Sequence, residues 1–219
     1  MRQDIDAAVE QLKRDILQGR FVPGQRLVEV DMMSHLDITR GRVRDVFKRL
    51  QAEGIVQLDK NRGASVRKVS REEVYNIFEV LEEVSILIIR KVGSRSEDEE
   101  MRRHLGESLA AARKFHDRSV NIVRVLDYMD ENARFWGDLA DLAGNPVLSD
   151  IRIRLQAPLF RLAMEGLTVS GNHEQWIARH EEIISALLDS NTTQATRHAR
   201  TSMHDVWKAI LELPDSAFA

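Results

Sequence analysis

The chain has 219 residues, 43% of them hydrophobic and 31% charged, a balance typical of folded chains rather than disordered ones. It contains no cysteine, which excludes disulfides, thiolate metal sites and cysteine nucleophiles. The net charge of −3 is divided unevenly, because residues 1–68 carry 14 Lys and Arg against 10 Asp and Glu, which leaves 18 against 25 for the remainder. A basic first part predicts contact with a polyanion.

The sequence also predicts the cellular localisation of the protein. The first residues include several acids and no continuous apolar run, so they do not resemble a signal peptide. No stretch approaches the roughly 18 uninterrupted apolar residues of a membrane span. We therefore expect a cytoplasmic protein without a membrane partner.

Three helices and a hairpin are predicted for the first part of the chain. Apolar residues recur at three- and four-residue steps, which predicts helices over residues 3–18, 29–35 and 40–52. Thr39 stands at the N-cap position of the third helix. Short β-rich runs on both sides of the polar stretch 59–63 predict a hairpin. Three helices followed by a hairpin are typical of a winged helix-turn-helix.

From residue 70 onward the pattern predicts helices and no strand. Ser70-Arg71-Glu72-Glu73 resembles a capping box that opens the first of them. The predicted helices cover residues 70–91, 97–116, 119–142, 146–166, 173–189 and 192–212. Pro158 should kink the fourth helix, and a break is expected from Gly166 to Gly171. The predicted fold is mainly α, with a winged helix-turn-helix domain at 1–69 and an all-α bundle at 70–219.

The third predicted helix has the composition of a DNA-reading helix. Residues 39–49 include five basic residues and one acid, and Arg40 and Arg44 share a face because they are four apart. The planar fork of an arginine can pair with guanine O6 and N7 or bind a phosphate. These residues begin the helix, and that end enters the major groove when a helix-turn-helix docks. A basic helix face is more often a solvated surface, but its place in a helix-turn-helix favours DNA.

The turn of the predicted hairpin adds a second basic element. Lys60-Asn61-Arg62-Gly63 combines two cations with a glycine that lets the backbone approach a duplex closely. Phosphates or the minor groove are its expected targets.

Several motifs in order carry a resemblance to a known family. The segments 16–27 (ILQGRFVPGQRL), 38–44 (ITRGRVR), 50–56 (LQAEGIV) and 62–66 (RGASV) resemble the N-terminal domain of the GntR family of bacterial transcription regulators. The helical remainder is similar to the ligand-sensing FCD domain of the FadR-type branch, on its helix order, on 142–148 (LAGNPVL) and on 180–186 (HEEIISA).

This resemblance implies a homodimer that binds double-stranded operator DNA, since two heads related by a two-fold axis read a palindrome. It implies that the DNA-binding residues are Thr39, Arg40, Gly41, Arg42 and Arg44, with Arg62 and Gly63 in the wing. Many members carry an arginine in the preceding helix where this chain has Val30, so base recognition from that position is not expected.

The resemblance also implies a metal site in many sensor domains of this branch, and this chain departs from it. Asn132 replaces the aspartate, Trp136 replaces one histidine, and Ser202 stands where the last histidine is usual, so only His180 is kept. One ligand of four should not hold a metal, and we expect no metal cofactor. The arginine that many members carry on the first sensor helix, a natural partner for an effector carboxylate, is Leu81 here.

The remaining hypothesis is a less polar, metal-free effector pocket lined by Leu81, Asn132, Trp136, His180 and Ser202. The alternative is that Trp136 fills the core and that the helical domain only dimerises. The predicted function is a dimeric, sequence-specific DNA-binding regulator, a repressor, whose operator affinity responds to a metabolite. An effector-free DNA-binding dimer stays open, and an all-α enzyme is disfavoured because His180 and Glu181 are adjacent and no catalytic motif accompanies them.

Overall fold

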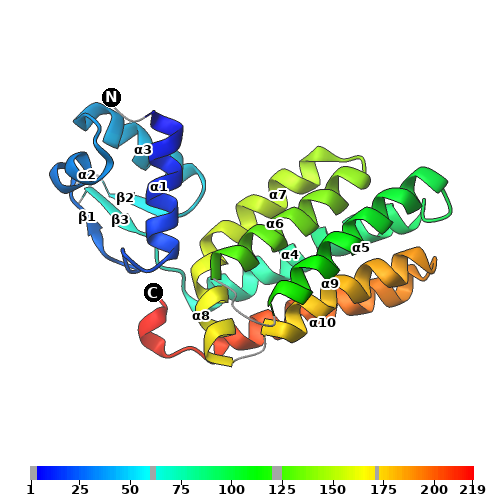
Figure 1. Ribbon diagram of the computed structural model, residues 1–219. Coiled ribbons are helices and arrows are strands. Elements are labelled where there is room, and N and C mark those ends of the chain that lie inside the picture. The colour runs from blue at the N-terminus through cyan, green and yellow to red at the C-terminus, as the bar shows by residue number, and fades with distance from the viewer. Residues whose placement is uncertain (1–3, 60–62, 120–124, 171–172) are drawn as a thin grey trace. The chain divides into compact units, whose positions relative to one another are not determined.

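The computed structural model describes residues 4–59, 63–119, 125–170 and 173–219 (Figure 1). By internal contacts the chain forms two compact units. The N-terminal unit contains the residues up to Val74 together with Arg154–Arg161 and Pro214–Ala219. The helical unit contains Tyr75–Ile153 and Leu162–Leu213. The predicted domain boundary at residues 69 and 70 stays a prediction. Among the helices in the described ranges, none combines the length and apolar character that crossing a membrane requires.

The N-terminal unit is built on three helices, α1 (Ile5–Leu17), α2 (Glu29–Leu36) and α3 (Arg40–Ala52), as the periodicity predicted. Asp37 ends α2 in the left-handed conformation (φ 49°), and Ile38 N donates to the carbonyl of Met33, which closes the turn before α3. Thr39 is the N-cap of α3, but its side chain makes no capping hydrogen bond. One stripe of each helix enters a common core, to which α3 contributes Val43, Val46, Phe47 and Leu50.

A small sheet completes the winged helix-turn-helix. Its strands are β1 (Arg26–Leu27), β2 (Val56–Asp59) and β3 (Gly63–Val66), antiparallel in the order β1-β3-β2. β2 and β3 are the predicted hairpin, paired from Val56 with Val66 to Asp59 with Gly63. Gly63 has a φ of 80°, a left-handed conformation that glycine adopts without the steric cost of a Cβ. The sequence patterns did not predict β1.

The last residues of the chain pack against the segment that follows the wing. Lys68 Nζ donates to the carbonyls of Ser216 and Phe218, both at 3.1 Å. Ala219 N donates to the carbonyl of Val69 at 3.0 Å, and the guanidinium of Arg71 lies 4.1 Å from the centroid of the Phe218 ring. These contacts place residues 214–219 in the N-terminal unit.

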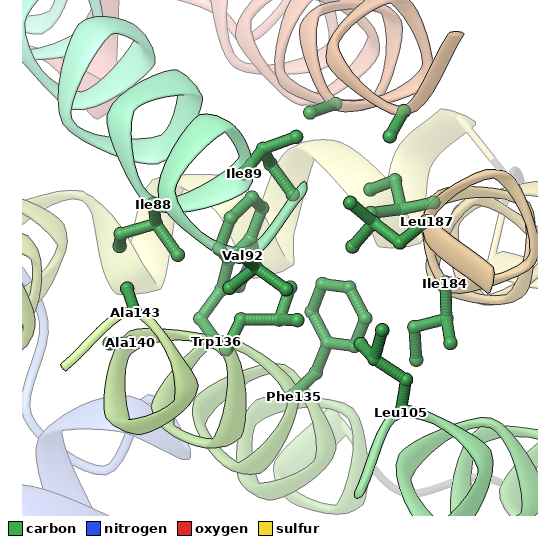
Figure 2. Packing of buried hydrophobic residues seen from close by; sticks show 14 of the residues in the cluster. Ile88, Ile89, Val92, Leu105, Phe135, Trp136, Ala140, Ala143, Ile184 and Leu187 are labelled. Atoms are coloured by element: carbon green, nitrogen blue, oxygen red, sulfur yellow. The ribbon is translucent and has the colours of Figure 1, made fainter. Parts of the chain in front are cut away.

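Within the described residues, helices and no strand follow the wing, as predicted, and the longer ones are α-helices. They are α4 (Arg71–Gly93), α5 (Glu99–Ser119), α6 (Val125–Leu142), α7 (Pro146–Gln156), α8 (Phe160–Ser170), α9 (His173–Leu188) and α10 (Thr192–Leu211). α9 packs between α5 and α10 (Figure 1). In the core of the helical unit, Phe135 and Trp136 project from α6 toward residues of α4 and α9 (Figure 2). The backbone N–H of Glu73 donates to Ser70 Oγ at 3.1 Å, so the Ser70 cap is confirmed, while the Glu73 carboxylate pairs with Arg67.

Two predicted helices differ from the observed ones. The helix predicted over 119–142 is observed as α6 from Val125 and Ser119 belongs to α5, while residues 120–124 of that prediction lie outside the described residues. The helix predicted over 146–166 is divided by a 3-10 turn at Ala157–Leu159, because Pro158 cannot continue the hydrogen bonding of an α-helix. The break expected at Gly166 is also wrong, since α8 continues to Ser170. This glycine serves a close helix contact instead, because a Cβ on it would lie 2.6 Å from the carbonyl oxygen of Ala209 on α10.

Candidate nucleic-acid interface and buried polar cluster

The first two turns of α3 present arginines to solvent. Val43 and Phe47 anchor the opposite face in the core, which fixes the orientation of the helix. The side chains of Arg40 and Arg44 are therefore exposed, by 56% and 60% respectively. Both lie at the helix N-terminus, where the positive end of the helix dipole also favours phosphate. The predicted basic face of α3 is present.

An acidic residue of α2 connects these two arginines, and the sequence analysis did not identify it. The carboxylate of Glu29 accepts hydrogen bonds from Arg44 Nε at 2.6 Å and Arg44 Nη2 at 3.2 Å. Arg40 Nε lies 3.3 Å from the second carboxylate oxygen. The hydrogen bond from Arg44 lowers the pKa of Glu29. An exposed pair of this kind adds little stability, so DNA can displace it at small cost.

A groove of about 540 Å³ joins α3 to the wing. It runs between the start of α2, the exposed face of α3 and the strands β2 and β3. Its lining includes Arg26, Glu29, Val30, Arg40, Arg44, Lys48, Asp59 and Gly63. Arg26 and Lys48 are further exposed cations at this groove that the sequence analysis did not select. The surface that could meet a duplex therefore combines residues from α2, α3 and the wing.

The other predicted DNA-binding residues lie around the same helix start or in the wing. Gly41 is exposed, and a Cβ built on it has no neighbouring atom within 4 Å. Arg42 is half-buried, and Thr39 lies about one turn earlier, at the N-cap of α3. Val30, which replaces a family arginine, is exposed on α2. Arg62 lies outside the described residues, as do Lys60 and Asn61.

The five residues predicted to line an effector pocket are all buried: Leu81, Asn132, Trp136, His180 and Ser202. Trp136 and His180 are linked through Phe135, whose ring stacks on His180 at 3.9 Å and meets Trp136 edge-on at 5.2 Å. Asn132 lies one turn before Trp136 on α6. Ser202 lies on α10, where it is 5% exposed. Trp136 packs in the core, as the alternative interpretation of this residue expects.

A buried arginine that the sequence analysis missed lies in the same region. Arg152 of α7 is only 6% exposed, and its guanidinium lies 4.1 Å from the centroid of the Trp136 ring. Its Nε donates to Ser85 Oγ at 3.2 Å, and Ser85 in turn donates to the carbonyl of Leu81. Burial lowers the pKa of Arg152 to about 9, so the side chain still carries its proton at neutral pH. The region around Trp136 is thus more polar than the sequence suggested.

His180 is 1% exposed, and within the part of the chain that the structure describes neither ring nitrogen has a hydrogen-bond partner. Burial, with further contributions from Arg152 and Arg134, lowers the pKa of His180 to about 3, so its imidazole is neutral. Among the described residues no group of three or more His, Cys, Asp or Glu side chains could hold a metal ion. With a guanidinium acting on the single histidine, these residues do not fit a bound metal cation.

Comparisons with known proteins agree with both parts of the chain. Residues 5–66 match the family model described as bacterial regulatory proteins, gntR family. Residues 73–205, more than half of the chain, match the FCD domain.

Individual relatives give the same result across nearly the full length. The HTH-type transcriptional repressor RspR of Escherichia coli K12 is 22% identical over 204 residues, 92% of this chain and 86% of that protein. The HTH-type transcriptional repressor NanR of Klebsiella aerogenes is 25% identical over 228 residues, 95% of this chain and 86% of that protein. A solved GntR regulator from Rhodococcus sp. RHA1 shares the fold, with a TM-score of 0.73 at 22% identity over 96% of this chain and 98% of that one. The chain therefore belongs to the GntR family of bacterial transcription regulators, in the branch that carries an FCD domain.

Proposed function

We propose that this DNA-binding transcription regulator acts in the cytoplasm as a dimeric repressor of a palindromic operator, and that a metabolite bound in the helical unit changes its affinity for DNA. The observation that carries the proposal is the exposed start of α3, where Arg40 and Arg44 line one groove with the wing. RspR and NanR, which are similar to most of this chain, are both named repressors, which supports repression rather than activation.

In this proposal the first turns of α3 enter the major groove. Arg40 and Arg44 read guanine edges, because each guanidinium can donate two parallel hydrogen bonds to O6 and N7. The remaining predicted residues, Thr39, Gly41, Arg42, Arg62 and Gly63, contact the sugar-phosphate backbone and set the register of the helix on the duplex. Phosphate contacts supply most of the affinity, and the arginine contacts supply the sequence preference.

The direct test is selection of duplexes from a random pool by the purified full-length protein. We expect enrichment of an inverted repeat whose half-sites are separated by about one helical turn, because two heads related by a two-fold axis bind it. Footprinting of the selected site then shows which groove each half-site presents. Binding without any sequence preference near physiological salt would overturn the proposal.

Glu29 offers a sharper test of the arginine contacts. In the Glu29→Gln variant a negative charge leaves the DNA-facing groove and both arginines lose the group that orients them. We expect tighter binding to scrambled DNA, a salt slope steeper by about one, and an operator preference that falls about fivefold or more. Binding isotherms on operator and scrambled duplexes at several salt concentrations measure all three.

The matched control is Asp45→Asn, which removes the same charge from α3 itself. Asp45 pairs with Lys48 at 3.8 Å, whereas Arg40 and Arg44 pair with Glu29. This variant should bind all DNA more tightly while keeping the wild-type operator preference. If Glu29→Gln also keeps that preference, Glu29 does not orient the reading arginines.

The surface of the helical unit supports dimerisation. Exposed apolar side chains lie on α4 and α7: Val80, Leu87, Val147, Ile151 and Ile153. The hydrogen bond between Arg152 and Ser85 shows that these two helices are in contact. Scattered apolar residues are normal at a surface, but five on two adjoining helices are typical of a protein interface.

We expect Ile151→Glu to weaken the dimer at least tenfold, because it places a charge in an apolar contact. Sedimentation equilibrium of the full-length protein measures the dissociation constant. The control is Val169→Glu on α8, whose side chain is also exposed but lies outside these two helices. Equal dimer strength in both variants would locate the interface elsewhere.

The effector part of the proposal rests on the buried residues Leu81, Asn132, Trp136, His180 and Ser202. A ligand that binds one arrangement of the helical units better than another must change operator affinity by the same coupling, typically about 1–3 kcal/mol. Adding fractionated bacterial metabolites to the protein–operator complex tests this by fluorescence anisotropy. Operator affinity that no fraction changes would favour the effector-free dimer. The all-α enzyme is set aside, since the family and its named relatives are transcription regulators.

A further inference from the structure

Two exposed valines line the DNA-facing groove of the N-terminal unit, and no step of the proposed function uses them. Val28 is the N-cap residue of α2 and is 43% exposed, and Val30, in the first turn of α2, is 54% exposed. Both belong to the lining of the groove of about 540 Å³ that also contains Arg40 and Arg44. We call Val28 and Val30 the valine pair.

The valine pair lies beside the two arginines that are proposed to read the operator. Glu29, the residue between the valines, accepts a hydrogen bond from Arg44 Nε at 2.6 Å, and its other carboxylate oxygen lies 3.3 Å from Arg40 Nε. These contacts hold the first turn of α2 against the first turns of α3. A duplex that meets the arginines therefore meets the valine pair as well.

Packing of α2 does not account for the valine pair. The buried side chains of α2 are Met32 and Leu36, and these attach the helix to the core of the N-terminal unit. Single exposed apolar side chains are normal at protein surfaces, and Val22, which is 47% exposed and outside the described lining of the groove, is one of them. The valine pair differs from Val22 because it lies among the charges of this groove.

Those charges select the occupant of the groove. The charged residues of its lining are four cations and two acids, namely Arg26, Arg40, Arg44, Lys48, Glu29 and Asp59. A groove with an excess of positive charge attracts a polyanion, and it repels the same groove of a second copy of the chain. Double-stranded DNA fits, because its phosphates pair with the cations while its base edges present both polar and apolar groups.

The bases differ in what they offer to a valine side chain. Thymine carries a C5-methyl group in the major groove, whereas the other groups that identify the bases there are hydrogen-bond donors and acceptors. Covering the methyl group with a valine is favourable, because both apolar surfaces leave the water. Against a polar base edge, a valine removes water without supplying a hydrogen bond. The valine pair therefore favours thymine over the other bases.

We propose that the valine pair packs against the C5-methyl group of a thymine in each operator half-site, next to the base pairs that Arg40 and Arg44 read. This inference rests on the proposed function, because it names a chemical group of the operator that the regulator recognises. It revises the expectation that residue 30 takes no part in base recognition. A valine cannot hydrogen-bond to a base, but it recognises one through an apolar contact.

The test uses the full-length protein and the operator that it selects from the random pool. Each thymine is replaced in turn by deoxyuridine, which removes the methyl group and leaves every hydrogen-bond donor and acceptor of the base in place. We expect one thymine per half-site at which uracil weakens binding about fourfold, and about 15-fold when both half-sites are changed, because each change uncovers one methyl group. Fluorescence anisotropy at constant salt measures the ratio of the two dissociation constants.

Variants of the valine pair should lose the preference for the methyl group. Val30→Ala removes the γ-methyl groups and introduces a strong helix former. Val28→Ser introduces a favoured N-cap residue where the valine makes no capping hydrogen bond, so both variants should fold with an unchanged or higher melting temperature. In the double variant we expect the ratio between uracil and thymine duplexes to fall below twofold, with wild-type affinity for the uracil duplex.

Each single variant should give an intermediate ratio, and the single variants decide the test if the double variant fails to fold. The matched control is Val22→Ala, which removes an equally exposed valine of the same unit from outside the described lining of the groove. This control should keep the ratio of the wild type at the same thymine.

Four outcomes overturn the inference. They are a selected site at which no uracil weakens binding, a ratio that the double variant leaves unchanged, an equal loss of affinity for both duplexes in that variant, and a weaker dimer with an unchanged ratio. The last of these would mean that a second copy of the chain covers the valine pair. A selected inverted repeat without any effect of the methyl groups refutes the inference and leaves the proposed function intact, whereas binding without sequence preference refutes both.

Discussion

Replacing both Arg40 and Arg44 with alanine should weaken operator binding by about 2–6 kcal/mol, which is roughly 30-fold to more than 10,000-fold. Each arginine that donates two hydrogen bonds to a guanine contributes about 1–3 kcal/mol to specific binding. Both side chains are exposed at the start of α3, so their removal opens no cavity in the core. The folded state should therefore keep its stability, which circular dichroism and thermal melting can verify.

The two substitutions should not be strictly additive. Both arginines share the carboxylate of Glu29, so removing one leaves the other with a stronger ion pair that competes with DNA. A double-mutant cycle measured by fluorescence anisotropy on the operator gives the coupling directly. The control is Arg49→Ala, which removes a cation from the other end of α3, where it pairs with Asp6. Operator affinity close to that of the wild type in the double variant would contradict the assignment of α3 as the reading helix.

The start of α3 was predictable because its signals are local. Thr39 at the N-cap, the arginines four residues apart and the apolar stripe opposite them all lie within about three turns of one helix, and the observed helix has the predicted bounds. The contact with Glu29 was not predictable in the same way. It depends on how the turn at Asp37 orients α2 against α3, and no spacing in the sequence encodes that angle.

The burial of Arg152 could not be predicted, because in α7 the apolar and charged residues take the opposite of their usual places in core and solvent. In α7 Ile151 and Ile153 are exposed, by 39% and 62%, whereas Arg152 between them is 6% exposed. A hydrophobicity pattern assigns the isoleucines to the core and the arginine to solvent, the opposite of what the structure shows. An exposed apolar side chain on the outer face of a helix is what the proposed dimer interface requires.

Gly166→Val should destabilise the protein by about 3 kcal/mol or more. A Cβ at residue 166 would lie 2.6 Å from the carbonyl oxygen of Ala209 and 3.0 Å from the backbone N of Ile210. These atoms belong to the backbone of α10, which cannot rotate away as a flexible side chain can. Relief of the clash requires α8 and α10 to separate, and separation exposes apolar surface that both helices bury, including Leu167 and Ile210.

Whether alanine at residue 166 raises or lowers the free energy of unfolding distinguishes a glycine required for helix packing from one that interrupts a helix. If Gly166 only interrupted a helix, alanine there would raise the free energy of unfolding, since alanine favours helices over glycine by about 1 kcal/mol. Gly106→Ala is the matched control, because Gly106 lies inside α5 and a Cβ on it meets nothing within 4 Å. We expect Gly106→Ala to stabilise slightly and Gly166→Ala to destabilise, in urea or thermal unfolding of the full-length protein. A stabilising Gly166→Ala would mean that α8 and α10 do not approach as closely as the structure places them.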